Sequence, residues 1–161
     1  MHHSTPAAPA SDRDTTLMRQ ALAEAQVAGE AGEVPVGAVL VSHDGSVLGR
    51  GGNRTRRDGI VHAHAELVAL AAAERAAGDF RLDESTMYVT LEPCLMCLGA
   101  LLQARVTRIV FGAREPKFGA LYSRFPLAEH PLVSRVHITE GVLAGESTEL
   151  LSGFFRELRA R

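Results

Sequence analysis

The chain has 161 residues, of which 46% are hydrophobic and 22% are charged, and 17 Lys and Arg against 19 Asp and Glu give a formal net charge of −2. This length and composition are typical of one globular domain that buries a core without disulfides, which excludes a wholly disordered chain. Apolar stretches such as 34–41 and 95–102 are far shorter than the roughly 18–20 residues that span a bilayer, and the slightly acidic charge argues against binding of long nucleic acids by charge alone.

Residues 1–12 are rich in Pro, Ala and Ser and predict a disordered leader, followed by a single domain at 13–161. The leader lacks the basic and apolar regions of a secretory signal, so we expect a cytoplasmic protein. Over 14–31, apolar residues recur at spacings of three and four, which predicts a helix. The β-branched segment 34–41, turn residues at 43–46 and the segment 47–51 predict a hairpin, and the polar residues 52–59 predict a loop.

The second half of the chain alternates strands with helices. Good helix formers predict a helix over 63–77 that Gly78 ends, and a short buried strand follows at 87–91. Pro93 is placed to begin a helix that reaches Ala104. A strand at 108–111, an irregular connection over 113–131, a weak strand at 136–139 and a helix at 146–159 complete the chain. This order predicts an α/β fold in which helices sandwich a mixed sheet.

Cys94 and Cys97 are the two cysteines of the chain, and they form one Cys-x-x-Cys unit at the start of a predicted helix. Such a unit is either a redox pair or part of a metal site. His64 stands at the start of the preceding helix. Two thiolates and one imidazole match Zn²⁺, and three protein ligands leave the fourth tetrahedral position to water, as in catalytic rather than closed structural sites.

Glu66 lies two residues after His64, so on a helix its side chain points well away from that of His64. We therefore do not expect Glu66 to be a metal ligand. A carboxylate beside the water, but outside the coordination shell, can move a proton between that water, the substrate and the leaving group. The combined pattern His-x-Glu…Pro-Cys-x-x-Cys is typical of zinc-dependent nucleobase deaminases.

Longer segments extend this pattern. From about Thr16 to the C-terminus the chain resembles the cytidine deaminase superfamily and, within it, the bacterial tRNA-specific adenosine deaminases, through the segments 33–41, 51–54, 64–70, 88–94, 110–114 and 150–155. The resemblance implies a three-layer αβα sandwich with a mixed five-stranded sheet, a homodimer and one Zn²⁺ per chain on His64, Cys94 and Cys97. It also implies Glu66 as the proton shuttle, with Asn53 and Ala65 at the substrate.

One region differs from those tRNA enzymes. After Arg114 they usually continue with Asp and a Gly-Ser-Leu segment, and later with an Asn-His pair, whereas this chain has the different segments 115–126 and 132–135. Two substrates therefore stay open: adenosine at the wobble position of a tRNA anticodon loop, which leads, and a free base or nucleoside of guanine, cytosine or adenosine type. Candidate residues for contacting either substrate are Glu115, Lys117, Phe118, Tyr122, Phe125 and Phe155.

Several of these residues also have structural interpretations. A protein without the enzyme activity would use Cys94 and Cys97 in a closed zinc site or as a redox pair that mediates interactions. Asn53 could cap a turn, and the arginines of 54–57 could form a solvated loop rather than contact phosphates. At least one of Phe154 and Phe155 is expected to pack, because adjacent helix positions diverge.

Overall fold

The computed structural model describes residues 9–161, so most of the expected leader at 1–12 lies outside the described residues. Helix α1 (Asp12–Glu30) begins inside the range expected for that leader. Ser11 is the reason: its hydroxyl accepts a hydrogen bond from the Asp14 N–H at 3.1 Å, and the Asp14 carboxylate accepts one from the Ser11 N–H at 3.0 Å. This reciprocal cap satisfies two backbone groups at the helix start, so the ordered chain begins before residue 13.

The sheet confirms the expected mixed architecture. Its five strands are β1 (Gly37–Val41), β2 (Val47–Gly52), β3 (Thr86–Leu91), β4 (Arg108–Ala113) and β5 (His137–Thr139), in the order β2-β1-β3-β4-β5. The pairs β1–β2 and β1–β3 are antiparallel, whereas β3–β4 and β4–β5 are parallel. The ends of β3 and β4 that feed the following segments therefore lie at the same edge of the sheet.

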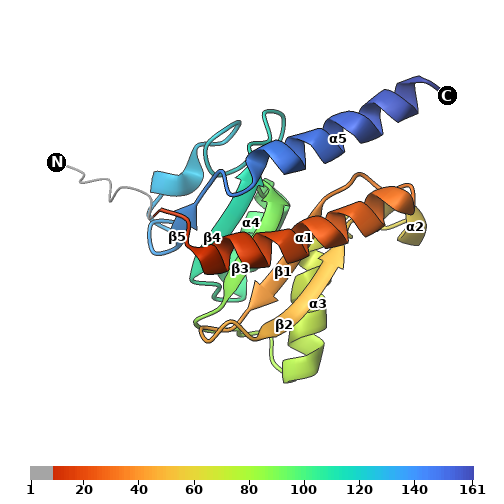
Figure 1. Cartoon of the computed structure of the whole chain (residues 1–161). Helices are drawn as coiled ribbons and strands as arrows, with labels where there is room; N and C mark the ends of the chain where they lie inside the picture. The colour runs from red at the N-terminus through yellow and green to blue at the C-terminus, as the bar shows by residue number, and fades with distance from the viewer. Residues whose placement is uncertain (1–8) are drawn as a thin grey trace.

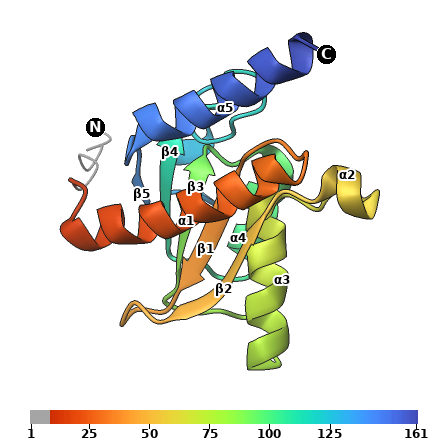
Figure 2. The same cartoon turned by 45° about the vertical axis from the view of Figure 1, so that its right-hand side comes forward.

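Helices cover both faces of this sheet, as Figures 1 and 2 show. Helices α3 (Ala65–Ala77) and α4 (Leu95–Gln103) pack on one face, and α1 and α5 (Ala144–Arg159) lie on the other. Alternating side chains of β1 separate the two cores, because Leu40 packs in the α3 and α4 cluster while Val39 packs in the α1 cluster. The expected three-layer αβα sandwich is confirmed.

The strand expected at 34–41 is shorter than predicted. Pro35 has no N–H for the sheet, and the Val36 N–H donates to the Val34 carbonyl at 2.8 Å, so this segment turns before β1 begins at Gly37. Gly37 then lies directly under α1, where a Cβ atom would be 2.0 Å from the Ala21 carbonyl oxygen. The missing side chain allows this close approach of helix and strand.

The polar loop expected at 52–59 contains a short helix, α2 (Thr55–Asp58). The buried carboxylate of Glu33 accepts hydrogen bonds from the N–H groups of Arg56 and Arg57, at 3.1 and 2.6 Å. A distant carboxylate therefore supplies the cap that the local sequence lacks. In the connection expected to be irregular, a 3-10 turn forms at Leu127–Glu129.

The sequence predicts that Pro93 begins the helix, but the structure places it outside α4. Cys94 is the N-cap, and the helix begins at Leu95. Pro93 thus precedes the cap and lies outside the helix. In the part of the chain described here, 9–161, no helix has the length and apolar character needed to span a bilayer.

Candidate functional site

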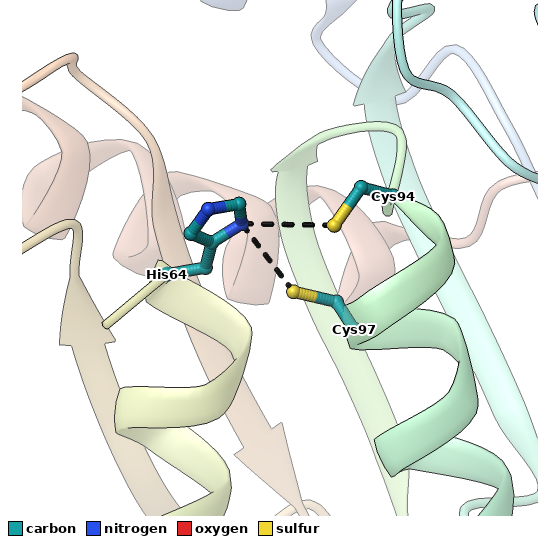
Figure 3. Close-up of side chains that lie close together, drawn as sticks. All are labelled: His64, Cys94 and Cys97. Atoms are coloured by element: carbon teal, nitrogen blue, oxygen red, sulfur yellow. Dashed lines mark hydrogen bonds between the residues drawn. The ribbon is translucent and has the colours of Figure 1, made fainter. Parts of the chain in front are cut away.

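His64 and Cys94 occupy equivalent positions in the fold. Each is the N-cap of its helix, with extended backbone angles, His64 on α3 and Cys94 on α4. Cys97 lies one turn into α4 and is buried. Figure 3 shows the three side chains pointing toward one another across the gap between the two helix starts. Free N–H groups and the positive dipole end at such starts favour thiolates and a bound anion.

The spacing of the three donor atoms fits a metal ion. His64 Nδ1 lies 3.7 Å from Cys94 Sγ and 3.6 Å from Cys97 Sγ, and all three donors lie within 4.8 Å of one another. Tetrahedral Zn²⁺, with usual Zn–N and Zn–S bonds of about 2.1 and 2.3 Å, separates nitrogen and sulfur ligands by about 3.6 Å. The donor set and its spacing therefore both fit Zn²⁺.

Electrostatics in the cluster favour charge separation. A hydrogen bond from the Cys97 thiol, and then one with His64, lower the pKa of Cys94 to about 4 despite burial. The same bond to Cys94, together with burial, raises the pKa of the Cys97 thiol. The hydrogen bond with Cys94 also raises the pKa of His64. Two thiolates in this half-buried space would repel each other, and a dication between them offsets that repulsion.

Glu66 lies in the first turn of α3, and its side chain is 4% exposed. It is not among the residues whose donor atoms cluster around a common point in residues 9–161, in keeping with the expectation that it is not a ligand. Burial raises the pKa of its carboxyl, while a hydrogen bond with Cys97 acts in the opposite direction. A buried carboxyl next to the candidate metal ligands is placed to accept and to donate a proton.

Asn53 follows β2 and reaches the start of α3. Its Oδ1 accepts a hydrogen bond from the Ala65 N–H at 2.8 Å. Because this bond occupies the carbonyl oxygen, the amide NH₂ group of Asn53 is left as a donor. Asn53 thus caps a helix rather than a turn, and Ala65, which is fully buried, is engaged through its backbone.

The segment 115–125, called the 115–125 loop below, runs beside Cys94. Gly119 forms an isolated antiparallel bridge with Cys94, and the Ala120 N–H donates to the Pro93 carbonyl at 2.9 Å. Glu115 is half-buried, and its carboxylate accepts from the Lys117 N–H at 2.9 Å. The residues of this loop that the sequence suggests for substrate contact therefore belong to a segment that is attached to the backbone at Pro93 and Cys94.

The aromatic candidates differ in exposure. Phe118 is 56% exposed and Phe125 is 38% exposed, and the Lys117 ammonium lies 5.2 Å from the centre of the Phe118 ring. Tyr122 is half-buried against Phe111, with the Arg114 guanidinium 5.0 Å from its ring centre. The rings of Phe118 and Phe125 are thus exposed to solvent, whereas the ring of Tyr122 is partly buried by its packing against Phe111.

Phe155 lies apart from this loop in the sequence, on α5. It is 40% exposed and packs edge-to-face against Phe154, with ring centres 5.3 Å apart. The more buried partner of the pair is Phe154, which faces a groove of about 710 Å³ between α1 and α5. A contact between Phe155 and substrate stays a prediction.

Two buried carboxylates were not singled out by sequence reasoning. Glu33 holds α2, and Glu92 accepts hydrogen bonds from backbone groups of the 115–125 loop. In the sequence, each precedes a short apolar or proline-containing segment, with no periodic signal. An acidic residue directly after a buried strand, as Glu92 is after β3, was the available hint, because an unpaired carboxylate is costly to bury there.

Comparison with known proteins adds a second line of evidence. A family model described as MafB19-like deaminase matches residues 12–159. A tRNA-specific adenosine deaminase from Agrobacterium fabrum is 46% identical over 146 residues, which cover 90% of this chain and 95% of that protein. The similarity includes nearly the whole of both chains.

A tRNA(Ile)-lysidine synthase from Deinococcus radiodurans is 49% identical over 144 residues, which are 89% of this chain; the chain spans only 25% of the length of that relative. A solved structure described under A-to-I editing by tRNA:A34 deaminases at the wobble position of transfer RNA superposes with a TM-score of 0.80. It is 45% identical, and the match covers 85% of this chain and 99% of that one. The fold, the sequence similarity and the spacing of the donor atoms therefore all indicate a deaminase.

Proposed function

This chain belongs to the MafB19-like deaminase family, and from that premise we propose that it is a zinc-dependent hydrolase that converts adenosine to inosine at the wobble position of tRNA. The observation that carries the proposal is the near full-length similarity to a tRNA-specific adenosine deaminase together with the His64, Cys94 and Cys97 cluster. The net reaction consumes one water and releases one ammonia.

In this proposal His64, Cys94 and Cys97 hold one Zn²⁺ per chain. When bound, the ion supplies Lewis acidity, which lowers the pKa of water and makes it a nucleophile at neutral pH. The two helix starts bring the ligands together, because His64 Nδ1 lies 3.6 and 3.7 Å from the two sulfur atoms.

Glu66 performs the proton transfers in this scheme. Its carboxylate takes one proton from the attacking water and delivers it to N1 of the adenine ring. It then takes the second proton from the oxygen added to the ring carbon and delivers it to the exocyclic nitrogen, which leaves as ammonia when its bond to that carbon breaks. Burial, which raises the pKa of Glu66, suits a group that must hold a proton between these steps. Its 4% exposure also keeps bulk water from competing for that proton.

Asn53 and Ala65 would position the nucleoside. Because the Ala65 N–H holds Asn53 Oδ1 at 2.8 Å, the Asn53 NH₂ group is oriented to donate to an oxygen or nitrogen acceptor of the substrate. Ala65 acts in this proposal through its backbone and through the small side chain that leaves room beside His64.

The 115–125 loop would contact the nucleotides that flank the target. A splayed anticodon loop needs surfaces on which unpaired bases can stack, and the exposed rings of Phe118 and Phe125 would provide them. Phe118 directly precedes Gly119, which forms a bridge with Cys94. The second candidate function, deamination of a free base or nucleoside, rests on the same loop, because its aromatic residues could also enclose a small ring. A redox role for Cys94 and Cys97 is disfavoured by the third donor, His64.

The deciding experiment uses the zinc-loaded protein. It is incubated separately with an RNA anticodon stem-loop carrying adenosine at the wobble position and with adenine, adenosine, guanine, cytosine and cytidine, and inosine and ammonia are measured. We expect inosine at the wobble position of the RNA. Ammonia from a free base without inosine in the RNA would overturn the tRNA assignment and support the second function.

We further propose a cytoplasmic homodimer. Leu95 and Met96 of α4 are 47% and 38% exposed, whereas Cys97, Leu98 and Leu101 of that helix are buried, so α4 presents apolar side chains to solvent next to the site. The cytoplasmic assignment follows from the proposed tRNA substrate. Sedimentation at micromolar concentration should give twice the 17.2 kDa chain mass, and a monomer would contradict the proposal.

A further inference from the structure

Glu92 connects the start of α4, which carries Cys94 and Cys97, to the 115–125 loop. It follows β3, immediately before Pro93 and Cys94, and its side chain is buried at 3% exposure. Its N–H donates to the Ala113 carbonyl at 2.9 Å, which continues the pairing of β3 with β4. The residue therefore stands on rigid backbone with its carboxylate directed away from solvent.

This carboxylate is surrounded by donors from the loop. Oε1 accepts from the Glu115 N–H at 3.1 Å and from the Ser123 hydroxyl. Oε2 accepts from the N–H groups of Leu121, Tyr122 and Ser123, at 3.0, 2.8 and 3.1 Å. Both ends of the loop are thus bound to a single side chain.

Loop packing leaves no slack around the carboxylate. A Cβ atom added to Gly119 would be 2.5 Å from Glu92 Cδ, so the loop backbone passes directly over it. Gly119 also bridges to Cys94, and the next residue, Ala120, donates to the Pro93 carbonyl. The position of the loop beside Cys94 is consequently set by Glu92, by these backbone contacts and by Ala120 and Leu121, which are fully buried in the core.

We propose that Glu92 is a positioning residue for substrate recognition, which fixes the 115–125 loop, and with it the exposed ring of Phe118, at the edge of the metal site. The expected effect of Glu92 on substrate recognition rests on the proposed function, whereas the positioning of the loop by Glu92 does not. The loop has no helix or strand of its own, and this carboxylate satisfies four of its backbone N–H groups, which a regular secondary structure would otherwise pair.

Hydrogen exchange of the backbone amides tests the positioning directly. In Glu92→Gln the side-chain volume is kept, but an NH₂ group faces the N–H donors, so peptides covering 115–125 should exchange at least about tenfold faster, with β3 and β4 unchanged. Gly119→Ala, which displaces the carboxylate from the other side, should give the same local effect. Ser123→Ala, which removes one donor, should give a smaller one.

Glu33→Gln is the matched control, because Glu33 is an equally buried carboxylate that holds the amides of Arg56 and Arg57 instead. It should accelerate exchange around α2 and leave the 115–125 loop as in the wild type. Loop exchange in Glu92→Gln within twofold of the wild type would overturn the proposal. Equal acceleration in β3 and β4 would also overturn it, because Glu92 would then be a general core residue.

Steady-state kinetics separate positioning from chemistry. For the stem-loop RNA, Glu92→Gln should raise KM about tenfold while kcat stays within about threefold and zinc content stays near one per chain. A lost zinc ion or a fall in kcat with unchanged KM would contradict the recognition role. A wild type inactive on the RNA would overturn the proposed function alone, since the exchange experiment needs no substrate.

Discussion

The two sides of the site are built in opposite ways. On one side, His64, Cys94 and Glu66 stand in the first turns of two helices, where cap geometry and local spacing decide where each side chain points. On the other side, the 115–125 loop has no regular structure and is held by bonds to Glu92 that span 23 to 31 residues of sequence. In the proposed function, the chemistry takes place at the helix starts, and recognition is the role of a loop that is anchored by Glu92.

This difference has a consequence for substrate choice. Changes at exposed positions of the loop, such as Phe118, are expected to leave the candidate metal donors in place, because α3 and α4 are fixed by a buried core to which the loop contributes Ala120 and Leu121. The departures at 115–126 and 132–135 from the usual tRNA-enzyme sequence are therefore compatible with an intact deaminase centre. Variants on the two sides should separate catalysis from binding.

The largest effect is expected for Glu66→Ala. Removing the proton shuttle should lower turnover about 10³-fold or more, while zinc stays near one per chain, because Glu66 is outside the ligand cluster. Cys94→Ala should lose the metal as well as the activity. Elemental analysis and inosine formation measure both. Metal lost from Glu66→Ala but kept by Cys94→Ala would reverse the assigned roles.

Asp14→Asn tests a part of the fold that lies outside both sides of the site. The buried Asp14 carboxylate accepts from Arg108 at 2.7 and 2.8 Å and from the Tyr88 hydroxyl at 2.7 Å, which ties α1 to β3 and β4. Leaving Arg108 without its partner should cost about 2–4 kcal/mol in the free energy of unfolding. Chemical denaturation measures this loss, with the exposed pair variant Asp79→Asn as the control at about 0–1 kcal/mol.

The same residue predicts a pH dependence. Burial acts to raise the pKa of Asp14, but hydrogen bonds from Arg108, Ser11 and Tyr88 outweigh it and hold the pKa well below the ordinary value of 3.8. Its stabilisation is therefore complete above that ordinary value and is lost as the pH falls below 3.8 toward the folded-state pKa. Asp14→Asn should flatten this part of the acid unfolding curve; an unchanged slope would contradict the role.

A smaller effect is expected on the recognition side. Phe118→Ala removes one stacking surface and should weaken stem-loop binding by about 1–3 kcal/mol, or roughly 5- to 150-fold, with zinc content unchanged. Phe80→Ala is a matched control, because Phe80 is 62% exposed and also lies under a cation, Arg81, 5.5 Å away. Equal losses in the two variants would mean that Phe118 has no specific contact with RNA.

Sequence reasoning brought the candidate metal donors together because they match a pattern typical of zinc-dependent deaminases, although His64 lies 30 and 33 residues from Cys94 and Cys97. The spacing of Cys94 and Cys97 and the position of His64 at a helix start specify donors on helices whose periodicity is visible in the sequence. The secondary structure of 34–36 and 55–58 was harder to predict from the sequence. Its causes are the missing N–H of Pro35 and the cap from Glu33, which act through contacts outside the local pattern.

The role of Glu92 could not be read from sequence for the same reason. Its partners Glu115 and Ser123 are 23 and 31 residues away, and a single carboxylate between apolar residues gives no periodic signal. The exposure of Phe118 and the partial burial of Tyr122 likewise depend on where the loop crosses the sheet edge. Long-range bonds to irregular backbone are thus the part of this site that needs coordinates.

The separate roles of the helix starts and the 115–125 loop are tested most directly by a ratio of two specificity constants. The ratio is kcat/KM for the stem-loop RNA divided by kcat/KM for free adenosine. It is measured in the wild type and in the Phe118→Ala/Tyr122→Ala variant. If the helix starts perform the chemistry and the 115–125 loop selects the RNA, the ratio should fall at least about tenfold in the variant at unchanged zinc content. An unchanged ratio, with both activities lowered together or both retained, would contradict the account.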